Sequence, residues 1–323
     1  MEGSEVGFLK VLQWSEEQCR EYLERQRWPD GARCPKCGAA EPWKIMRKTA
    51  TKNAVRSLYR CRACKRQFTA TVGTIFEDSK IPLNKWFAGI YLMCSSKKGI
   101  SAHQLHRELD ITYKSAWFMC QRVRYAMSDR NPTLLTGVIE ADETYVGGRG
   151  TRGHPKDRSH MMTMSQRIKA AYDKKTPVLG ILERSGRVRT IVMSPITKKG
   201  AQRVLADNIA LEKSCLVTDQ SPLYHGISRR LPHATVNHEQ EYVRDGVIHT
   251  QGIENYWSLL KRGIVGTYHH LSIGHLPHYL DEFEFRFNRR KVCDAERFAS
   301  LMGQTRGRLL WYCQTPQPEN PHA

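Results

Sequence analysis

The stretch TGVIEADETYVGG, residues 136–148, gives the clearest indication of the fold class of this chain. Its apolar and polar residues alternate as in a β-strand, and two glycines end it. Because side chains along a strand alternate between its two faces, Glu140 and Asp142 are expected to share one face and Glu143 to lie on the other. An acidic side chain within an apolar strand is unfavourable unless it pairs or binds a cation. The stretch therefore predicts a strand whose acidic residues need a partner.

Further strand-like runs and one helix follow this stretch. They are PVLGILE (177–183), VRTIVMSP (188–195), a helix from Lys199 to about Leu211, and CLVTD (215–219). The order strand, strand, strand, helix, strand predicts a mixed α/β sheet. The last run ends in Asp219. Because an aspartate at a strand end is often only a turn former, Asp219 becomes informative only together with the other acidic residues.

A third acidic residue lies on a predicted helix that runs from about Thr250 to Arg262. Glu254 and Lys261 are seven residues apart, which is two helical turns, so both project from the same side. A pair of this kind is most often part of a solvated helix face. Trp257 belongs to the apolar stripe of this helix and is interpreted as a core residue, with stacking on a flipped base as the alternative.

Three carboxylates that converge at one edge of a sheet are the ligands expected for two divalent metal ions. Hard oxygen donors with water-filled positions favour Mg²⁺, with Mn²⁺ as the alternative. Two such ions, about 3.5–4 Å apart, activate an attacking oxygen and stabilise the leaving oxygen of a phosphodiester. Asp142, Asp219 and Glu254 therefore predict metal-dependent chemistry on nucleic acid.

Four cysteines form two CxxC pairs, Cys34 with Cys37 and Cys61 with Cys64, and 23 residues separate the pairs. Two residues between cysteines let both thiolates point into one turn, and two such turns complete a tetrahedral zinc site. Short strand-like runs lie between and after the pairs. The segment is interpreted as a zinc ribbon with a structural Zn²⁺; a redox pair or four unrelated buried thiols is the alternative.

Helical stretches follow the cysteine-rich segment. PLNKWFAGIYLMC (82–94) is strongly apolar and is expected to be buried. Ser101 and Thr112 are predicted to cap SAHQLHREL and TYKSAWFMCQRVRYAM, which a short turn joins. Two short helices with basic surroundings fit a helix-turn-helix, and an ordinary helical hairpin is the alternative. The residues predicted to contact DNA are Tyr113, Lys114, Arg122, Lys261 and Arg262.

The charge balance points to a polyanionic partner. The 323 residues include 51 Lys and Arg against 32 Asp and Glu, which gives a net charge of +19. Because neutralising a phosphate releases counterions, nucleic acid is the first partner considered and an anionic membrane surface the second. No apolar run is long enough to span a bilayer, and the acidic N-terminus lacks the apolar core of a signal peptide. The chain is therefore expected in the reducing cytoplasm, where disulfides rarely persist. Its ten cysteines are accordingly expected to have roles other than disulfide formation.

Three runs of this sequence resemble those of bacterial insertion-sequence transposases of the 1595 family. They are EADETYVGG (140–148), VTDQSPLYHGI (217–227) and HTQGIENYWSLLKRGIVGTYHH (249–270). The resemblance covers nearly the whole chain, from the CxxC pairs to FRFNRR near Asn288. It implies a zinc ribbon joined to an RNase H-like DDE domain of the retroviral-integrase type. One departure is visible, because Gln251 stands where relatives often have Asn, which keeps the amide on a longer side chain.

The resemblance implies a DNA transposase that hydrolyses phosphodiesters at the element ends and joins the freed 3′-OH to target DNA. By resemblance, Asp142, Asp219 and Glu254 take the three acid positions, and Lys261 takes the family's additional basic position, where it would hold a phosphate. A homo-oligomer is expected, namely a dimer on DNA at the nucleoid. A zinc-ribbon DNA-binding regulator and an RNase H-like nuclease without strand joining are the alternatives.

The sequence is divided into four expected segments. Residues 1–78 form an N-terminal helix and the zinc ribbon, 79–131 the helix-turn-helix-like segment, 132–292 the RNase H-like DDE catalytic domain, and 293–323 a C-terminal helix and a disordered tail. Within the third segment, residues 149–175 are basic and loop-like. Their charge is interpreted as solvated, with contact to the DNA backbone as the alternative.

Overall fold

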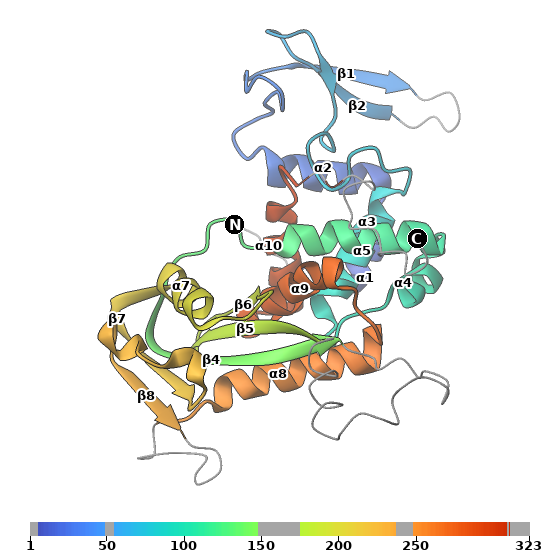
Figure 1. Ribbon diagram of the computed structural model, residues 1–323. Coiled ribbons are helices and arrows are strands. Elements are labelled where there is room, and N and C mark those ends of the chain that lie inside the picture. The colour runs from blue at the N-terminus through green and yellow to red at the C-terminus, as the bar shows by residue number, and fades with distance from the viewer. Residues whose placement is uncertain (1–5, 49–54, 148–174, 237–247, 309, 311–323) are drawn as a thin grey trace, which may run out of the picture. The chain divides into compact units, whose positions relative to one another are not determined.

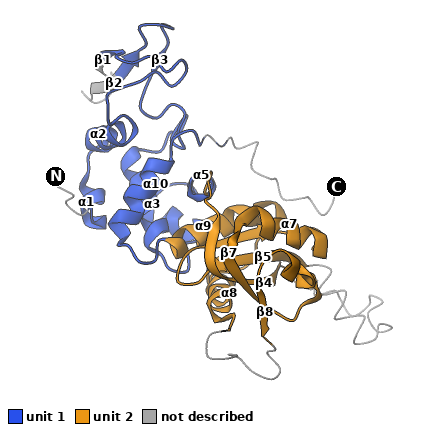
Figure 2. Ribbon diagram, turned by 90° about the vertical axis from the view of Figure 1, so that its left-hand side faces the viewer, with its two compact units in different colours: residues 1–128, 289–315 blue, residues 129–288, 316–323 orange. Residues whose placement is uncertain are grey.

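A computed structural model describes residues 6–48, 55–147, 175–236, 248–308 and 310 (Figure 1). The predictions for the basic segment up to residue 174 and for the C-terminal tail lie outside these residues. The chain divides into two compact units, one of residues 1–128 and 289–315 and one of residues 129–288 and 316–323 (Figure 2). This grouping does not test the division into four segments, which stays a prediction.

The second unit is built on a five-stranded sheet in the order β6-β5-β4-β7-β8. The strands are β4 (Leu135–Gly147), β5 (Lys175–Glu183), β6 (Val188–Val192), β7 (Ile209–Asp219) and β8 (His233–Val236). β4, β5 and β6 pair antiparallel, whereas β7 runs parallel to β4 and β8 runs parallel to β7. The predicted mixed α/β fold is confirmed, and the strands that carry Asp142 and Asp219 are neighbours.

Both faces of this sheet are covered. The helices are α7 (Lys198–Asn208), α8 (Gln251–Gly263) and α9 (Leu276–Asn288), with short helical segments η2 (Pro222–Tyr224), η3 (Ile227–Arg229), η4 (Ile264–Tyr268) and η5 (Ile273–His275). Ile139 and Ala141 of β4 pack in one core with residues of α7, whereas Val146 of the same strand packs in a second core with residues of α8 and α9. Figure 1 shows α8 running beside β4. The alternation along β4 thus sends even-numbered residues to the α8 face and odd-numbered residues to the α7 face.

A glycine in β5 lets α8 lie close against the sheet. A Cβ added to Gly180 would lie 2.4 Å from the Trp257 ring and 2.8 Å from the Cδ1 atom of Ile253. Such distances are well below van der Waals contact, so a larger residue would push the helix away. The position of α8 relative to β4 therefore depends on the small size of Gly180, which has no Cβ.

The first unit combines the cysteine-rich sheet with helices. Its elements are α1 (Phe8–Gln13), α2 (Glu16–Arg27), β1 (Trp43–Lys48), β2 (Val55–Arg60), β3 (Gln67–Phe68), α3 (Leu83–Ser95), α4 (Ala102–Leu109), α5 (Tyr113–Met127) and α10 (Asp294–Gln304). The predicted N-caps Ser101 and Thr112 accept hydrogen bonds from the first turns of α4 and α5. α3 is buried as predicted. The helix expected after residue 293 is α10, and its Phe298 packs against Tyr22 of α2 and Phe87 of α3.

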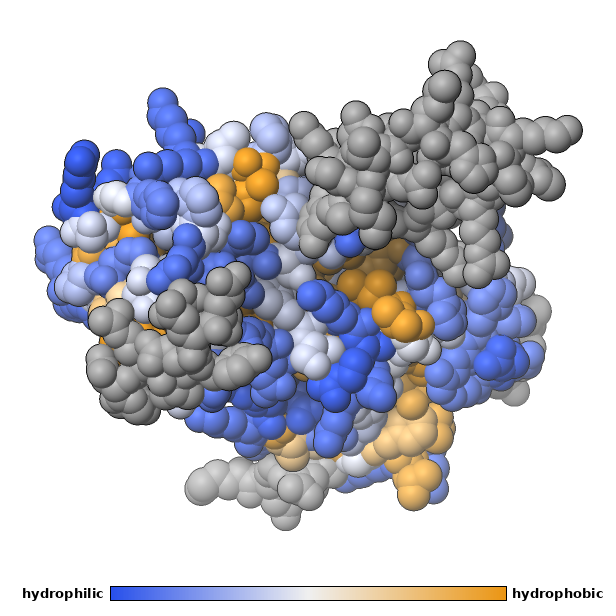
Figure 3. Space-filling model, turned by 60° about the horizontal axis from the view of Figure 1, so that its bottom comes forward, coloured by the Kyte–Doolittle hydropathy of each residue, from blue (hydrophilic) through white to orange (hydrophobic). Residues whose placement is uncertain are grey.

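In the described part of the chain, no helix combines the length and apolar character needed to cross a bilayer. The face drawn in Figure 3 is mostly hydrophilic, and its hydrophobic side chains form separate patches. The excess of Lys and Arg over Asp and Glu gives the chain a net charge of +19. A surface of this kind suits a polyanion better than an apolar partner.

Candidate active site

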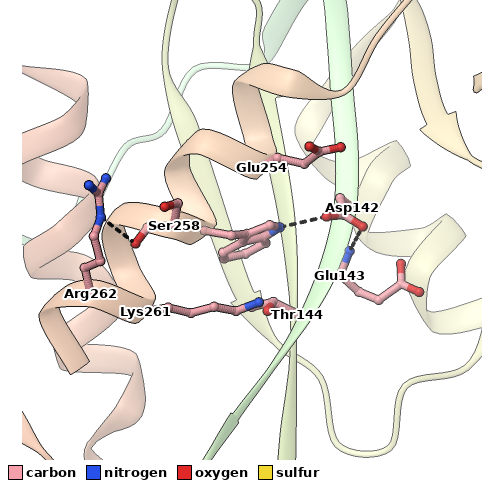
Figure 4. Close-up of a pocket in the computed structure, with 8 residues that line it drawn as sticks. Asp142, Glu143, Thr144, Glu254, Ser258, Lys261 and Arg262 are labelled. Atoms are coloured by element: carbon pink, nitrogen blue, oxygen red, sulfur yellow. Dashed lines mark hydrogen bonds between the residues drawn. The ribbon is translucent and has the colours of Figure 1, made fainter. Parts of the chain in front are cut away.

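Asp142 lies on the α8 face of β4, in contact with Trp257. The indole Nε1 donates a hydrogen bond of 3.1 Å to Asp142 Oδ2, and the backbone N–H of Glu143 donates one of 2.8 Å to Oδ1 (Figure 4). Burial, followed by the nearby charges of Glu143 and Asp219, raises the pKa of Asp142 to about 7. Both oxygens of this carboxyl are therefore oriented by the protein, while its negative charge is poorly stabilised.

Asp219 is the last residue of β7. Glu140 of β4 pairs with Val217 of β7 in a parallel register. The parallel pairing ends there, and Asp142 within β4 and Asp219 at the end of β7 each lie two residues beyond it, close enough that the charge of Asp219 raises the pKa of Asp142. The backbone N–H of Ser221 donates a hydrogen bond of 3.0 Å to Asp219 Oδ1. The two aspartates that were predicted to converge thus lie on neighbouring strands, and their role as a pair stays a prediction.

Glu254 lies in the first turn of α8, and its Oε1 accepts a hydrogen bond of 2.8 Å from the Thr250 hydroxyl. It lines a pocket of about 400 Å³ together with Asp142 and Lys261. Figure 4 shows the Lys261 side chain extending across this pocket toward Thr144. The acid on β4 and the acid and cation on α8 thus face one cavity.

Asp219 lines a different pocket. This cavity has a volume of about 420 Å³ and also includes His225 and His233. Among the residues that the structure describes, only the four cysteines form a group of three or more possible metal ligands whose donor atoms all lie within 4.8 Å of one another. Asp142 and Glu254 thus share one pocket while Asp219 lines another, and the three carboxylates do not form a closed ligand cluster among the described residues.

Trp257 is a core residue. Its side chain is 4% exposed and packs in the core between α8 and the sheet. The indole is therefore not available for stacking on a base, and the structure supports the interpretation of Trp257 as a core residue. Gln251, in contrast, is exposed at the start of α8.

Glu143 is a further carboxylate of this region to which the sequence alone assigned no role. It projects to the opposite face of β4 from Asp142, as the alternation predicts. Tyr224 Oη donates a hydrogen bond of 2.8 Å to Glu143 Oε2, and Ser221 Oγ donates one of 3.2 Å to Oε1. Burial raises the pKa of Glu143, and Asp219 adds to this effect. Glu143 thus ties β4 to the turn that follows Asp219. In the sequence, the role of Glu143 was indicated only by its position next to Asp142 within one apolar strand.

The four predicted zinc ligands lie together in the first unit. The Sγ atoms of Cys34 and Cys64 are 3.7 Å apart, and those of Cys37 and Cys61 are 3.5 Å apart. Gly38, directly after the first CxxC pair, has a positive φ of +74°, which glycine adopts without strain. The backbone N–H of Cys64 is the largest influence that lowers the pKa of Cys61, to about 6. Since zinc binds thiolates, this quartet fits a structural Zn²⁺.

One predicted DNA contact is contradicted by the structure. Arg122 is 3% exposed, and its guanidinium donates hydrogen bonds to the backbone carbonyls of Ile75, Glu77 and Leu310. A side chain held in this way packs the interior of the first unit and does not reach DNA. The prediction failed because a count of basic residues does not show which side of a helix faces inward.

The other residues predicted to contact DNA are exposed. Tyr113 and Lys114 lie in the first turn of α5, and Lys261 and Arg262 lie near the end of α8. The Tyr113 ring stacks on His103 of α4 with 4.2 Å between ring centroids. Asp110 between α4 and α5 has a left-handed backbone, which makes the predicted tight turn. DNA contact at these four residues stays a prediction.

Two family models match this chain. Residues 134–288 match the ISXO2-like transposase domain of the IS1595 family, and residues 14–67 match the transposase zinc-ribbon domain of that family. The chain is also 28% identical over 277 residues to a curated protein of Halobacterium salinarum described as an uncharacterized protein in transposable element ISH50. The aligned region covers 84% of this chain and 90% of the relative. The two domain matches include the four cysteines, the three carboxylates and Lys261.

Proposed function

The chain belongs to the IS1595 family of transposases, and we propose that it hydrolyses phosphodiesters at the ends of its element and joins the freed 3′-OH to target DNA. The observation that supports this proposal most strongly is the poorly stabilised carboxyl of Asp142, beside Asp219 and in one pocket with Glu254 and Lys261. Acids on neighbouring strands with a cation opposite are suited to hold metal on one side and phosphate on the other.

The donor set fits divalent metal ions. Burial and two nearby carboxylates disfavour the ionised form of Asp142, so positive charge at the site would favour its full ionisation at neutral pH. Mg²⁺ or Mn²⁺ would supply that charge, activate the attacking oxygen and stabilise the leaving oxygen. In this proposal Asp142 and Asp219 bind the metal, and Glu254 completes the ligand set.

The protein's own groups orient the reacting centre. Trp257 Nε1 holds Asp142 Oδ2, and the Ser221 N–H holds Asp219 Oδ1, so both aspartates are directed before substrate binds. Lys261 contacts a phosphate near the scissile bond as a point charge, two helical turns from Glu254. Such orientation lowers the barrier because the acids need not rearrange during the reaction.

The first unit supplies DNA recognition in this proposal. Zinc bound by the four cysteines stabilises the ribbon, whose exposed basic residues track the DNA backbone. Tyr113 and Lys114, at the start of α5, contact the element end. Two copies of the chain act together, one on each end of the element.

A joining assay tests the proposal. The zinc-loaded protein is incubated with an oligonucleotide that carries the element end and with a target plasmid, in parallel with Mg²⁺, with Ca²⁺ and without added metal. Joined products that require Mg²⁺ are expected. Cleavage without joining would favour a nuclease, and binding without either reaction would favour a DNA-binding regulator; each of these outcomes would overturn the proposal.

A further inference from the structure

Glu140, a further acid on β4, is completely buried and does not line the pocket. Its side chain is 0% exposed and lies two residues before Asp142, on the same face of the strand. An ionised carboxylate is strongly disfavoured in such a position unless charged and hydrogen-bonding partners surround it. The partners of Glu140 therefore indicate its role.

The first partner is the start of α8. Glu140 Oε2 accepts a hydrogen bond of 3.0 Å from the backbone N–H of Ile253, the residue directly before Glu254. Thr250, at the N-cap position of this helix, makes no side-chain capping hydrogen bond. The capping acceptor is thus supplied from the sheet, where its negative charge also interacts favourably with the helix dipole.

A glycine allows this approach. A Cβ added to Gly252 would lie 2.7 Å from Glu140 Oε2 and 2.6 Å from the Cδ2 atom of Leu182. Only a residue without a side chain lets the first turn of α8 come this close to the carboxylate. In the sequence GIE (252–254), Gly252 therefore allows the close contact with Glu140, and Glu254 two residues later lines the pocket.

The second partner is Arg184, the residue directly after β5. Its Nε donates a hydrogen bond of 3.0 Å to Glu140 Oε1, and its Nη2 donates one of 2.9 Å to the backbone carbonyl of His249. One guanidinium thus connects the carboxylate on the sheet with the segment that leads into α8. His249 Nδ1 lies 3.6 Å from the same Glu140 oxygen.

We propose that Glu140 and Arg184 are positioning residues, which fix the first turn of α8 against β4 so that Glu254 is held at the pocket beside Asp142. The inference rests on the proposed function, because it assigns Glu254 to a metal site. Two of the three acids on β4 then have different tasks in the site. Asp142 acts at the pocket, and Glu140 sets the place of the third carboxylate.

Metal affinity distinguishes positioning from simple stabilisation. Binding of Mn²⁺ to the zinc-loaded protein is measured by the electron paramagnetic resonance signal of free Mn²⁺, with no DNA and no turnover. Glu140→Gln keeps the size of the side chain but loses the charge that pairs with Arg184. The Kd for Mn²⁺ is expected to rise about tenfold, as for groups that orient metal ligands elsewhere.

A matched control exists on α9. Glu282 is also 0% exposed and pairs with a buried arginine, Arg286, within the same unit. It also accepts a hydrogen bond from Tyr268, beyond the far end of α8. Glu282→Gln therefore removes a comparable buried charge without touching the first turn of α8. This variant is expected to lose thermal stability but to keep the wild-type Kd for Mn²⁺.

A second variant and a local measurement keep the test decisive. Arg184→Lys retains the charge but cannot reach Glu140 and His249 together, so it should also weaken Mn²⁺ binding, even if Glu140→Gln folds poorly. Hydrogen–deuterium exchange of the peptide that contains Ile253 should become faster in both variants and remain unchanged in Glu282→Gln.

The outcomes separate the inference from the proposed function. Equal Mn²⁺ affinities in Glu140→Gln, Arg184→Lys and Glu282→Gln would overturn the positioning role. If Asp142→Asn lost Mn²⁺ binding in the same experiment, the proposed metal site would still stand. If the wild-type protein binds no Mn²⁺, or if Asp142→Asn binds it as tightly as the wild type, the metal site itself fails, and the positioning role fails with it.

Discussion

Replacing Asp142 by asparagine is predicted to stabilise the protein at pH 8 in the absence of Mg²⁺. The pKa of Asp142 is raised from 3.8 to about 7, chiefly by burial and then by the charges of Glu143 and Asp219. Because the folded state holds this proton more tightly than the unfolded state, the free energy of unfolding falls as the pH rises from about 4 to about 7. The wild-type protein therefore carries a penalty above pH 7 that the asparagine variant lacks.

The size of this effect follows from the shift. Each pKa unit corresponds to about 1.4 kcal/mol, so the shift corresponds to at most about 4 kcal/mol at pH 8. At pH 5 the pH has passed only the lower part of the interval between the two pKa values. The difference in unfolding free energy between Asp142→Asn and the wild-type protein should therefore be about 2 kcal/mol there. Added Mg²⁺ should recover the loss in the wild-type protein but not in Asp142→Asn, which lacks the charged ligand.

Urea unfolding followed by tryptophan fluorescence measures both effects at pH 5 and pH 8. The buffer is free of Mg²⁺ but contains no chelator, so that the four-cysteine site keeps its zinc. Asp207→Asn is the control, because it removes the same charge from the exposed surface of α7 in the same unit. The reasoning would be refuted if Asp142→Asn were no more stable than the wild-type protein at pH 8, or if its advantage did not grow with pH.

Four further substitutions have expected outcomes. Cys61→Ser should release the bound zinc, and unchanged zinc content by metal analysis would show that the quartet is not the site. Arg122→Met should lower the stability of the first unit by at least about 2 kcal/mol, because three backbone carbonyls lose their donor. Lys114→Ala should weaken DNA binding in a gel-shift titration and leave the melting temperature unchanged. The reverse pattern would contradict the assignment of Arg122 to the interior and Lys114 to DNA contact. Gly180→Ala should cost about 1–3 kcal/mol through overlap with Trp257, and a neutral result in thermal denaturation would argue against close packing of α8.

Much of the site could be predicted from the sequence because its signals are local. The alternation along residues 136–148 placed Glu140 and Asp142 on one face and Glu143 on the other, as the structure has them. The paired CxxC spacing predicted the four-cysteine quartet. Ser101 and Thr112 were correctly predicted as the N-caps of α4 and α5. Each of these depends on residues only a few positions apart.

What the sequence did not provide depends on contacts between distant residues. Arg184 lies 44 positions after Glu140, and no local pattern pairs them. Arg122 was assigned to the surface because basic residues surround it, yet its partners are backbone carbonyls as far away as Leu310. The side of α5 that faces inward is set by tertiary packing, which a charge count does not contain.

The roles of Asp219 and Glu254 in strand joining can be measured directly. Asp219→Ala and Glu254→Ala are compared with Asp207→Ala in the Mg²⁺-dependent joining assay, with binding to the element end measured on the same preparations. We predict that both carboxylate variants bind the element end like the wild-type protein but give no joined product, while Asp207→Ala joins normally. Full joining by Asp219→Ala or Glu254→Ala would contradict the assignment of these carboxylates to catalysis.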